Sequence, residues 1–248
     1  MVIEQHQAEA PRVEILGIPV DRVTMDEALE RIDGFVADGG PHLVVTADSS
    51  GIVAAQTDAF FRDLLLSADL VTPDSAGILW AAKRQGKPIG ARVSGVDLVD
   101  ALCARSADRG YRIYFLGAEP GVAEMAAERL RLRHPGCRIV GARHGYFPPE
   151  SDEIVAREIA EAKPDILFVA MGIPRQEKFI LATQEIIGAK VAMGVGGSLD
   201  VFSGRTRRAP RLFQRMKLEW FWRLMLNPRK YQKVRALPQF VWMVLRAR

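Results

Sequence analysis

The sequence predicts an α/β fold: a Rossmann-like parallel sheet with helices on both faces, followed by a basic helical C-terminal appendage. Short apolar segments such as 42–46 and 112–116 are each followed by a glycine-containing turn and a helix-length segment. This order recurs at least four times along the chain, which is typical of parallel strands joined by helical crossovers. An abrupt change of charge after residue 204 predicts the appendage.

The individual elements follow from local signals. Two short strands or a hairpin are expected around Gly17 and Pro19, after a loose leader. Thr24 and Glu27 have the spacing of a capping box, which predicts a helix from about Met25 to Asp38. Segments in which an apolar strand runs into a turn are 42–51, 68–74, 111–121, 137–147, 165–177 and 190–204. Helices are expected after residue 51 through Phe61 and Leu66, then within 75–86, 93–110, 122–136 and 150–162, and up to about Ile187.

The last 44 residues, 205–248, differ from the rest of the chain in charge. They hold thirteen Lys or Arg and one acidic residue, a formal charge of +12, against −8 for residues 1–204. Three of the four tryptophans are also there: Trp220, Trp222 and Trp242. Basic residues interleaved with aromatic ones suit a surface that is anionic and partly apolar, such as a membrane face. The sequence therefore predicts an α/β domain over 1–204 and a separate membrane-binding appendage over 205–248.

Two prolines and the bulk composition refine this expectation. Pro228 and Pro238 are expected to break or kink the appendage into two or three helices. No apolar run approaches roughly 18 residues, so no membrane-spanning helix is expected. The N-terminus lacks the basic start and apolar run of a secretory signal, so a cytoplasmic protein is expected. Cys103 and Cys137 have no metal-ligand spacing and are expected to be reduced thiols.

The sequence predicts neither a metal nor another cofactor. The four histidines are scattered and form no zinc motif. No DxD motif occurs, which argues against the Mg²⁺ or Mn²⁺ clamp that many sugar-nucleotide enzymes use. The charge of a diphosphate would then have to be met by Arg, Lys and backbone N–H groups.

Polar residues that follow predicted strands are the candidate site residues, because parallel sheets bind ligands at the carboxyl ends of their strands. Asp74 follows an apolar strand and Pro73, and a carboxylate on such a rigid corner suits a general base. The alternative is that Asp74 caps the helix that starts at Ser75. Thr46 and Asp48 have the same two interpretations, contact with a substrate hydroxyl or helix capping.

Glycines follow three of the predicted strands, at Gly117, Gly172, Gly194, Gly196 and Gly197. Glycine lets the backbone approach a ligand closely and present its N–H groups to a phosphate. A structural turn is the alternative, since the chain has neither a Walker loop nor a complete GxGxxG motif.

Three further side chains could contact a ligand. Arg92 could pair with a phosphate or be an ordinary surface arginine. Gln176 could hydrogen-bond a sugar or a base, or lie in a solvated first helical turn. Asp200 could accept hydrogen bonds from a ribose or a sugar, or cap the residues that follow it.

Eight segments in order resemble the WecG/TagA/CpsF family of bacterial glycosyltransferases. They are SADLVTPD, ARVSGVDL, FLGAEPGVAE, HGYF, MGIPRQEKF, GVGGSLDVFSG, RRAP and LEWFWRLMLNPRKY. The resemblance runs from about Val13 to Tyr231. It implies inverting, metal-independent transfer of a sugar of the N-acetylmannosamine type, or of glucose, from a UDP-sugar to a polyprenyl-diphosphate-linked saccharide. It also implies a peripheral enzyme at the cytoplasmic face of the membrane, which serves teichoic acid or other cell-surface polysaccharide synthesis.

The resemblance assigns roles to particular residues. It implies that Asp74 is the general base, that Thr46 contacts substrate, and that Arg92 and Gln176 line the same pocket. Asp200 and the glycines before it match the UDP-binding side. The appendage would close over the site and bring Arg223, Lys230 and Lys233 to the diphosphate. A homo-oligomer formed through the catalytic domain is possible.

Two positions depart from the family pattern, and two other classes of protein compete with it. Asp48 stands where members often have Asn, and Ser75 where they often have Gly; the extra charge near Asp74 could raise the pKa of the base or alter acceptor contacts. The basic tail could instead bind nucleic acid, although no nucleic-acid motif occurs. A dehydrogenase would need a glycine fingerprint in its first strand–helix unit, which this chain lacks.

Overall fold

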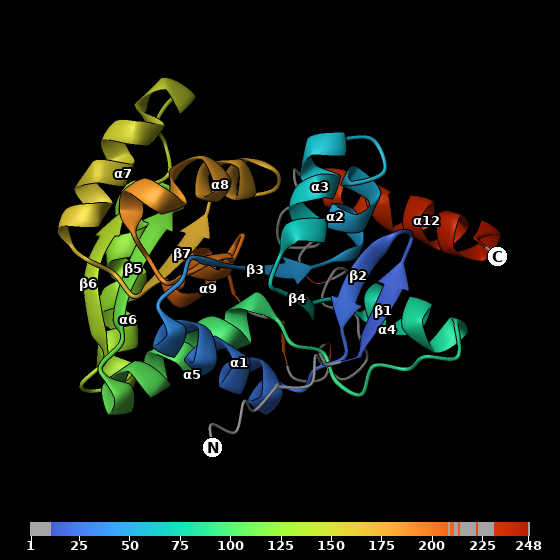
Figure 1. The fold of residues 1–248 in the computed structure, drawn as a ribbon, viewed down its shortest axis with the longest axis horizontal. Helices are drawn as coiled ribbons and strands as arrows, with labels where there is room; N and C mark the ends of the chain where they lie inside the picture. The colour runs from blue at the N-terminus through green and yellow to red at the C-terminus, as the bar shows by residue number, and fades with distance from the viewer. Residues whose placement is uncertain (1–10, 208, 211–212, 214–221, 223–230, 248) are drawn as a thin grey trace, which may run out of the picture.

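A six-stranded parallel sheet forms the centre of the molecule (Figure 1), in the order β4-β3-β8-β7-β5-β6. The computed structural model describes residues 11–207, 209–210, 213, 222 and 231–247. The strands of the sheet are β3 (His42–Ala47), β4 (Leu70–Pro73), β5 (Arg112–Gly117), β6 (Arg138–Arg143), β7 (Ile166–Ala170) and β8 (Val191–Gly194). All five neighbouring pairs are parallel, so the predicted fold class is confirmed.

Helices cover both faces of the sheet and bury an apolar core on each side (Figure 1). One face carries α1 (Met25–Asp38), α5 (Gly95–Arg109), α6 (Val122–Arg133) and α9 (Ser198–Phe202). The other carries α2 (Ser49–Ala54), α3 (Ala59–Ser67), α4 (Ala76–Arg84), α7 (Asp152–Glu161), α8 (Arg175–Ile187) and α12 (Tyr231–Arg246), with a short 3-10 turn, η1 (Pro149–Ser151). Because parallel strands are covered on both faces, they read as nearly continuous apolar runs in the sequence.

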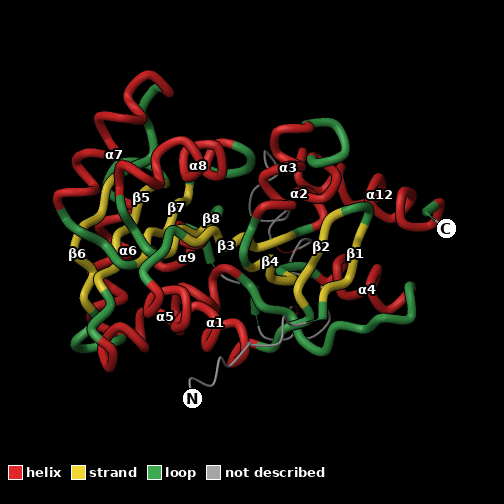
Figure 2. Tube along the Cα trace, in the orientation of Figure 1, coloured by secondary structure: helices red, strands yellow, loops and turns green. Residues whose placement is uncertain are grey.

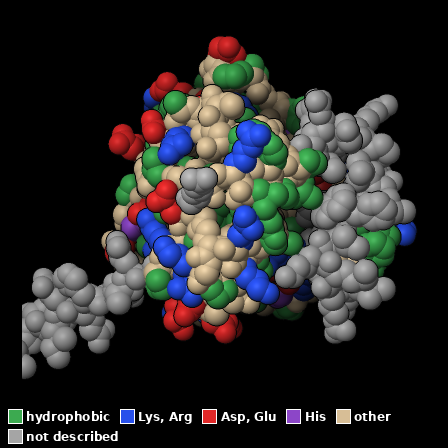
Figure 3. Space-filling model, turned by 90° about the vertical axis from the view of Figure 1, so that its right-hand side faces the viewer, with side chains coloured by type: hydrophobic (Ala, Val, Ile, Leu, Met, Phe, Trp, Pro, Cys, Tyr) green, Lys and Arg blue, Asp and Glu red, His purple; other side chains and the backbone are tan. Residues whose placement is uncertain are grey.

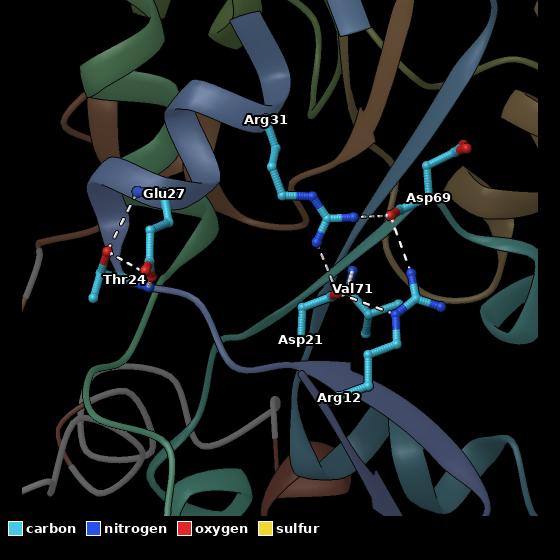
Figure 4. A network of polar contacts seen from close by, with 7 residues as sticks. All are labelled: Arg12, Asp21, Thr24, Glu27, Arg31, Asp69 and Val71. Atoms are coloured by element: carbon cyan, nitrogen blue, oxygen red, sulfur yellow. Dashed lines mark hydrogen bonds and ion pairs between the residues drawn. The ribbon is translucent and has the colours of Figure 1, made fainter. Parts of the chain in front are cut away.

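The predicted hairpin is present as β1 (Arg12–Ile15) and β2 (Ile18–Asp21), which pair antiparallel beside the main sheet (Figure 2). The buried carboxylate of Asp21 ties this hairpin to β4 and α1 (Figure 4). Its Oδ1 accepts from Arg12 at 3.1 Å and from Arg31 at 2.8 Å, and its Oδ2 accepts from the backbone N–H of Val71 at 2.7 Å. Since β4 runs directly into Asp74, this network helps to fix the strand that carries a candidate site residue.

Helix boundaries follow the capping signals closely. Thr24 and Glu27 form the predicted capping box, and α1 has the predicted ends. The single helix expected through Phe61 is instead two helices, α2 and α3. Asp58 accepts a hydrogen bond from the backbone N–H of Phe61 at 3.0 Å and so starts a new helix after a turn.

The C-terminal helix α12 packs on the α/β domain through Phe240 and Val244, which are 0% and 4% exposed. It lies against α2 and α4. Phe240 occupies a notch at Gly77, where an added Cβ would lie 3.3 Å from the Phe240 ring. The helix continues through Pro238, so of the predicted break or kink, a break at this proline is wrong; Pro228 lies outside the described residues. Across the described ranges, every helix is too short or too polar to cross a bilayer.

Candidate active site

The carboxyl ends of β3, β4 and β8 bring the leading candidate residues to one edge of the sheet. The register pairs Thr46 with Thr72 and Val45 with Gly194, so Thr46 and Asp74 lie at neighbouring strand ends. The Thr46 hydroxyl donates to the carbonyl of Gly194 at 3.2 Å. The backbone N–H of Asp74 donates to the carbonyl of Ala47 at 2.9 Å. The three strand ends are thus joined by hydrogen bonds at the place where a parallel sheet binds ligands.

Asp74 is held at a rigid corner between β4 and α4. The carbonyl of Pro73 accepts from the backbone N–H of Val93 at 3.0 Å, and the Oδ2 atom of Asp74 accepts from the N–H of Gly95 at 3.3 Å. Gly95 opens α5, a helix of 15 residues, so its N–H and the helix dipole both favour the ionised carboxylate. Ser75, and not Asp74, is the N-cap of α4, so the capping interpretation of Asp74 is wrong.

Thr46 lies between the start of α5 and the glycine turn after β8. An added Cβ on Gly95 would meet Cγ2 of Thr46 at 3.4 Å and Oγ1 at 3.5 Å, with the Ser198 hydroxyl at 3.7 Å. Thr46 is half-buried, and its hydroxyl faces the carbonyl of Gly194. Neither Gly95 nor Ser198 was singled out from the sequence. Their only signal is that each lies at the start of a helix after a turn.

Asp48 is the N-cap of α2. Its Oδ1 accepts from the backbone N–H of Gly51 at 2.7 Å and from the Ser50 hydroxyl at 2.6 Å, which confirms the capping interpretation. Ser75, the second departure from the family pattern, places its hydroxyl 3.1 Å from that of Ser49. The two departures therefore stabilise the starts of α2 and α4, on either side of the strand ends.

The candidate glycines have different local environments. An added Cβ on Gly117 would lie 2.4 Å from the carbonyl oxygen of Ala170, and one on Gly194 would lie 2.5 Å from Nε2 of Gln176. Close packing accounts for glycine at these two positions. At Gly172 and Gly196, by contrast, φ is +80° and +52°, and no atom of the described residues lies within 4 Å of an added Cβ. Within the described part of the chain, the space beside these two turns is open.

Gln176 is 3% exposed and links the turns after β7 and β8. Its Oε1 accepts from the backbone N–H groups of Gly172 and Gly196, each at 3.1 Å. Its Nε2 donates to Oε1 of Glu177 at 2.6 Å. Because both residues are buried, the interpretation of this segment as a solvated helical turn is wrong. Glu177 was assigned no role from the sequence, because its burial depends on how α8 packs.

The remaining candidate residues do not take part in the hydrogen bonds given above, which link Thr46, Asp74 and Gln176 to neighbouring strand ends. Arg92 is half-buried and precedes Val93, which bonds the corner at Pro73. Asp200 lies within α9 and does not start it, because Gly197 is the N-cap. Arg223 and Lys230 lie outside the described residues. Lys233 belongs to the first turn of α12, but its side chain also lies outside them.

Groups of metal-ligand side chains and the two cysteines are further candidates for a chemical role. Among the described residues, no three His, Cys, Asp or Glu side chains are grouped as metal ligands. Cys103 and Cys137 are buried, reduced and close to each other. The Cys103 thiol lowers the pKa of Cys137 to about 7 by hydrogen bonding, and the pKa of Cys103 is raised in return. Cys103 lies near the middle of α5 and Cys137 lies just before β6, at the end of that strand away from the candidate site.

These features define a Rossmann-like α/β protein with a polar, glycine-lined site at the carboxyl edge of its sheet. The chain belongs to the glycosyl transferase WecG/TagA/CpsF family, whose sequence profile matches residues 13–248. It is therefore a glycosyltransferase. Family membership gives no support to the dehydrogenase and nucleic-acid-binding alternatives.

Two similar curated proteins carry the same enzyme name, N-acetylglucosaminyldiphosphoundecaprenol N-acetyl-beta-D-mannosaminyltransferase. The protein of that name from Staphylococcus aureus (strain MRSA252) is 32% identical over 250 residues, which cover 100% of this chain and 97% of the relative. The one from Bacillus spizizenii (strain ATCC 23059 / NRRL B-14472 / W23) is 37% identical over 203 residues, covering 82% of this chain and 78% of the relative.

Proposed function

We propose that this protein transfers an N-acetylmannosamine-type sugar from a UDP-sugar to a polyprenyl-diphosphate-linked saccharide, with inversion at the anomeric carbon and without a metal. The names of the two relatives support the transferred sugar and the lipid-linked acceptor. The observation that carries the proposal is the position of Asp74. Its carboxylate is fixed at the carboxyl edge of the sheet beside Thr46, in a chain of glycosyltransferase family membership.

In the proposed reaction Asp74 takes the proton from the acceptor hydroxyl. The hydroxyl oxygen then attacks the anomeric carbon, and the bond between that carbon and the diphosphate oxygen breaks as UDP leaves. Thr46 contacts the reacting sugars from the neighbouring strand end. The hydrogen bond from the Gly95 N–H orients the Asp74 carboxylate at this strand end.

The leaving UDP is proposed to lie over the open turns at Gly172 and Gly196, with Asp200 on the nucleotide side. Backbone N–H groups of glycine turns can meet phosphate charge. We assign the remaining charge compensation to Arg92, Arg223, Lys230 and Lys233, in place of a divalent cation. A homo-oligomer stays a prediction, which sizing of the full-length protein in detergent would test.

The proposed acceptor never leaves the bilayer, so we place the enzyme peripherally at the cytoplasmic face of an anionic membrane. One end of the molecule has suitable side chains: Lys and Arg lie among hydrophobic groups in the middle of this face, with Asp and Glu mainly at its edges (Figure 3). Trp242 and Leu245 of α12 are each 51% exposed, and the Arg246 guanidinium lies 3.9 Å from the Trp242 ring centroid. Tryptophan and basic residues together favour the interfacial zone of a membrane.

The deciding experiment measures UDP release from a panel of UDP-sugars with a short-chain polyprenyl-diphosphate saccharide acceptor, in the presence of EDTA. We expect turnover that depends on the acceptor and is largest with the N-acetylmannosamine donor. Turnover with UDP-glucose and with no other donor would show that the transferred sugar is glucose and not N-acetylmannosamine. A requirement for added divalent metal would overturn the metal-independent mechanism. Lack of UDP binding would overturn the proposal that the donor is a UDP-sugar.

A further inference from the structure

Glu177 has no assigned role, yet its carboxylate lies at the end of a hydrogen-bond chain that leads to Thr46. It is 2% exposed and accepts from Nε2 of Gln176 at 2.6 Å. The other end of the same amide, Oε1, accepts the N–H groups of Gly172 and Gly196. One side chain therefore holds the turns after two neighbouring strands, and the position of that side chain depends on the residue that follows it.

The orientation of the Gln176 amide determines whether this link exists. The two ends of a glutamine amide are nearly equal in size, but only the oxygen can accept a hydrogen bond from a backbone N–H. If the amide were flipped, its NH₂ group would face two N–H donors, and buried donors without an acceptor are costly. An ionised carboxylate at residue 177 accepts hydrogen bonds but donates none, so it selects the orientation with Nε2 towards itself.

We propose that Glu177 is a positioning residue, which acts through Gln176 to fix the glycine turns after β7 and β8 and thereby the site at Thr46. Gly194 connects the Gln176–Glu177 pair to Thr46. Atoms of Gln176 and Glu177 lie 2.5 Å and 2.9 Å from an added Cβ on Gly194, so both side chains pack directly on its backbone. The carbonyl of Gly194 in turn accepts the hydrogen bond of the Thr46 hydroxyl at 3.2 Å.

The positioning role rests on the proposed function, because Thr46 and the open turns at Gly172 and Gly196 are where substrate is proposed to bind. Small displacements of reacting groups are expensive in catalysis; a shift of about 1 Å can cost on the order of 10²-fold in rate. Loss of the hydrogen bonds to Gln176 would make the turns at Gly172 and Gly196 less rigid. The expected consequence is a lower kcat in a protein that still folds.

An exchange of the two side chains tests this role. In the single variant Gln176→Glu two carboxylates face each other, so the contact becomes repulsive. In Glu177→Gln the residue at 177 can present either its oxygen or its NH₂ group, so its contact no longer selects the orientation at 176 and only the two glycine N–H groups still favour it. In the double variant Gln176→Glu/Glu177→Gln, the new Glu accepts both glycine N–H groups and the new Gln donates to it. The hydrogen bonds among residues 172, 176, 177 and 196, and the net charge, are then those of the wild type.

Two readouts are measured for the three variants and for the control Glu153→Gln, whose carboxylate is 61% exposed and pairs with Arg157 on the surface. The first is hydrogen exchange of the Gly172 and Gly196 amides by NMR. The second is kcat and KM for UDP release, with Tm measured alongside. We expect both single variants to lose amide protection and kcat, by about tenfold for Gln176→Glu. The double variant should regain much of both.

Each outcome decides between positioning and simple structural support. Amide protection unchanged in both single variants would overturn the proposal, as would protection that the double variant fails to restore. Changes in exchange without a change in kcat would also overturn it, because the turns would then not matter to the reaction. If the wild type itself released no UDP, the proposed function would fail, and the exchange data would still establish whether Glu177 fixes the turns.

Discussion

The backbone N–H of Gly95 lies 3.3 Å from Oδ2 of Asp74 and donates a hydrogen bond to it. The two residues are 21 positions apart, and α4 lies between them in the chain. The contact places the first residue of α5 against the carboxylate at the end of β4. A helix N-terminus of this length stabilises a negative charge, so the carboxylate that is proposed as the base lies where its charge is favoured.

Asp74→Asn is expected to reduce kcat for UDP release by on the order of 10²- to 10⁴-fold, the usual contribution of a general base. The amide oxygen of Asn can still accept from Gly95, so Tm and UDP affinity should change little. Steady-state kinetics and calorimetric titration with UDP would measure these quantities. Turnover near the wild-type value would show that another group takes the proton.

Gly194→Ala is expected to reduce stability and activity together. The new Cβ would lie 2.5 Å from Nε2 of Gln176, within a buried contact. Overpacking of this kind costs about 1–3 kcal/mol in the free energy of unfolding. Gly197→Ala is the matched control for stability, since among the described residues its added Cβ meets Oδ2 of Asp200 alone, at 3.5 Å, and its φ is −83°. Equal Tm values for the two variants would contradict this account.

Asp21→Asn is expected to lower the free energy of unfolding by about 1–3 kcal/mol, since it removes a buried charge that accepts from two guanidinium groups and a backbone N–H. Urea denaturation would measure the change. Glu153→Gln, at an exposed ion pair, should change stability by no more than about 0.5 kcal/mol. A similar small change for Asp21→Asn would mean that the network in Figure 4 contributes little.

Phe240→Ala is expected to loosen α12 from the α/β domain. The side chain is fully buried in the notch at Gly77, and truncation of a buried Phe costs about 3–5 kcal/mol. Limited proteolysis should cut the variant near α12 sooner than the wild type. Trp242→Ala is the comparison: its side chain is 51% exposed, so cleavage should be unchanged, while flotation with anionic liposomes should decrease.

Stability at alkaline pH should depend on Tyr111. Burial, together with a hydrogen bond to Asp33, raises the pKa of its phenol from 10.0 to about 12. Because the folded value is the higher one, the neutral phenol stabilises the fold below pH 10, and this contribution is lost as the pH rises from 10 to about 12. Tyr111→Phe should therefore lose less stability than the wild type over that interval. Parallel urea titrations at pH 9 and about 11.5 would detect the difference.

The sheet could be predicted from the sequence because its signals are local. Apolar strands, glycine turns and the capping box at Thr24 specify their own elements, and α1 has the expected ends. Strand order is a different matter. Nothing within Val191–Gly194 indicates that this strand lies between β3 and β7, because that placement depends on how the crossover helices pack. The break between α2 and α3 was missed for a different reason, since its signal, the N-cap at Asp58, is local but was not used.

The candidate site was predictable where a residue follows a strand. Asp74 and Thr46 were identified on that basis, and they lie at neighbouring strand ends. Gly95 and Glu177 could not be identified in this way. Each lies on a helix, and each reaches the site through tertiary packing, across 21 residues to Asp74 in the first case and through Gln176 to the β8 turn in the second.

The place of β8 in the sheet has a consequence for how the protein is made. It is the last strand of the sheet to be synthesised, and it is the only strand that joins the β3–β4 pair to β7, β5 and β6. A chain that lacked β8 would leave β3 and β7 each with an unpaired edge, and such edges favour misassociation. Pairing of β8 with both strands covers these edges and places Gly194 against Thr46. Closure of the sheet and assembly of this part of the candidate site therefore depend on the same strand.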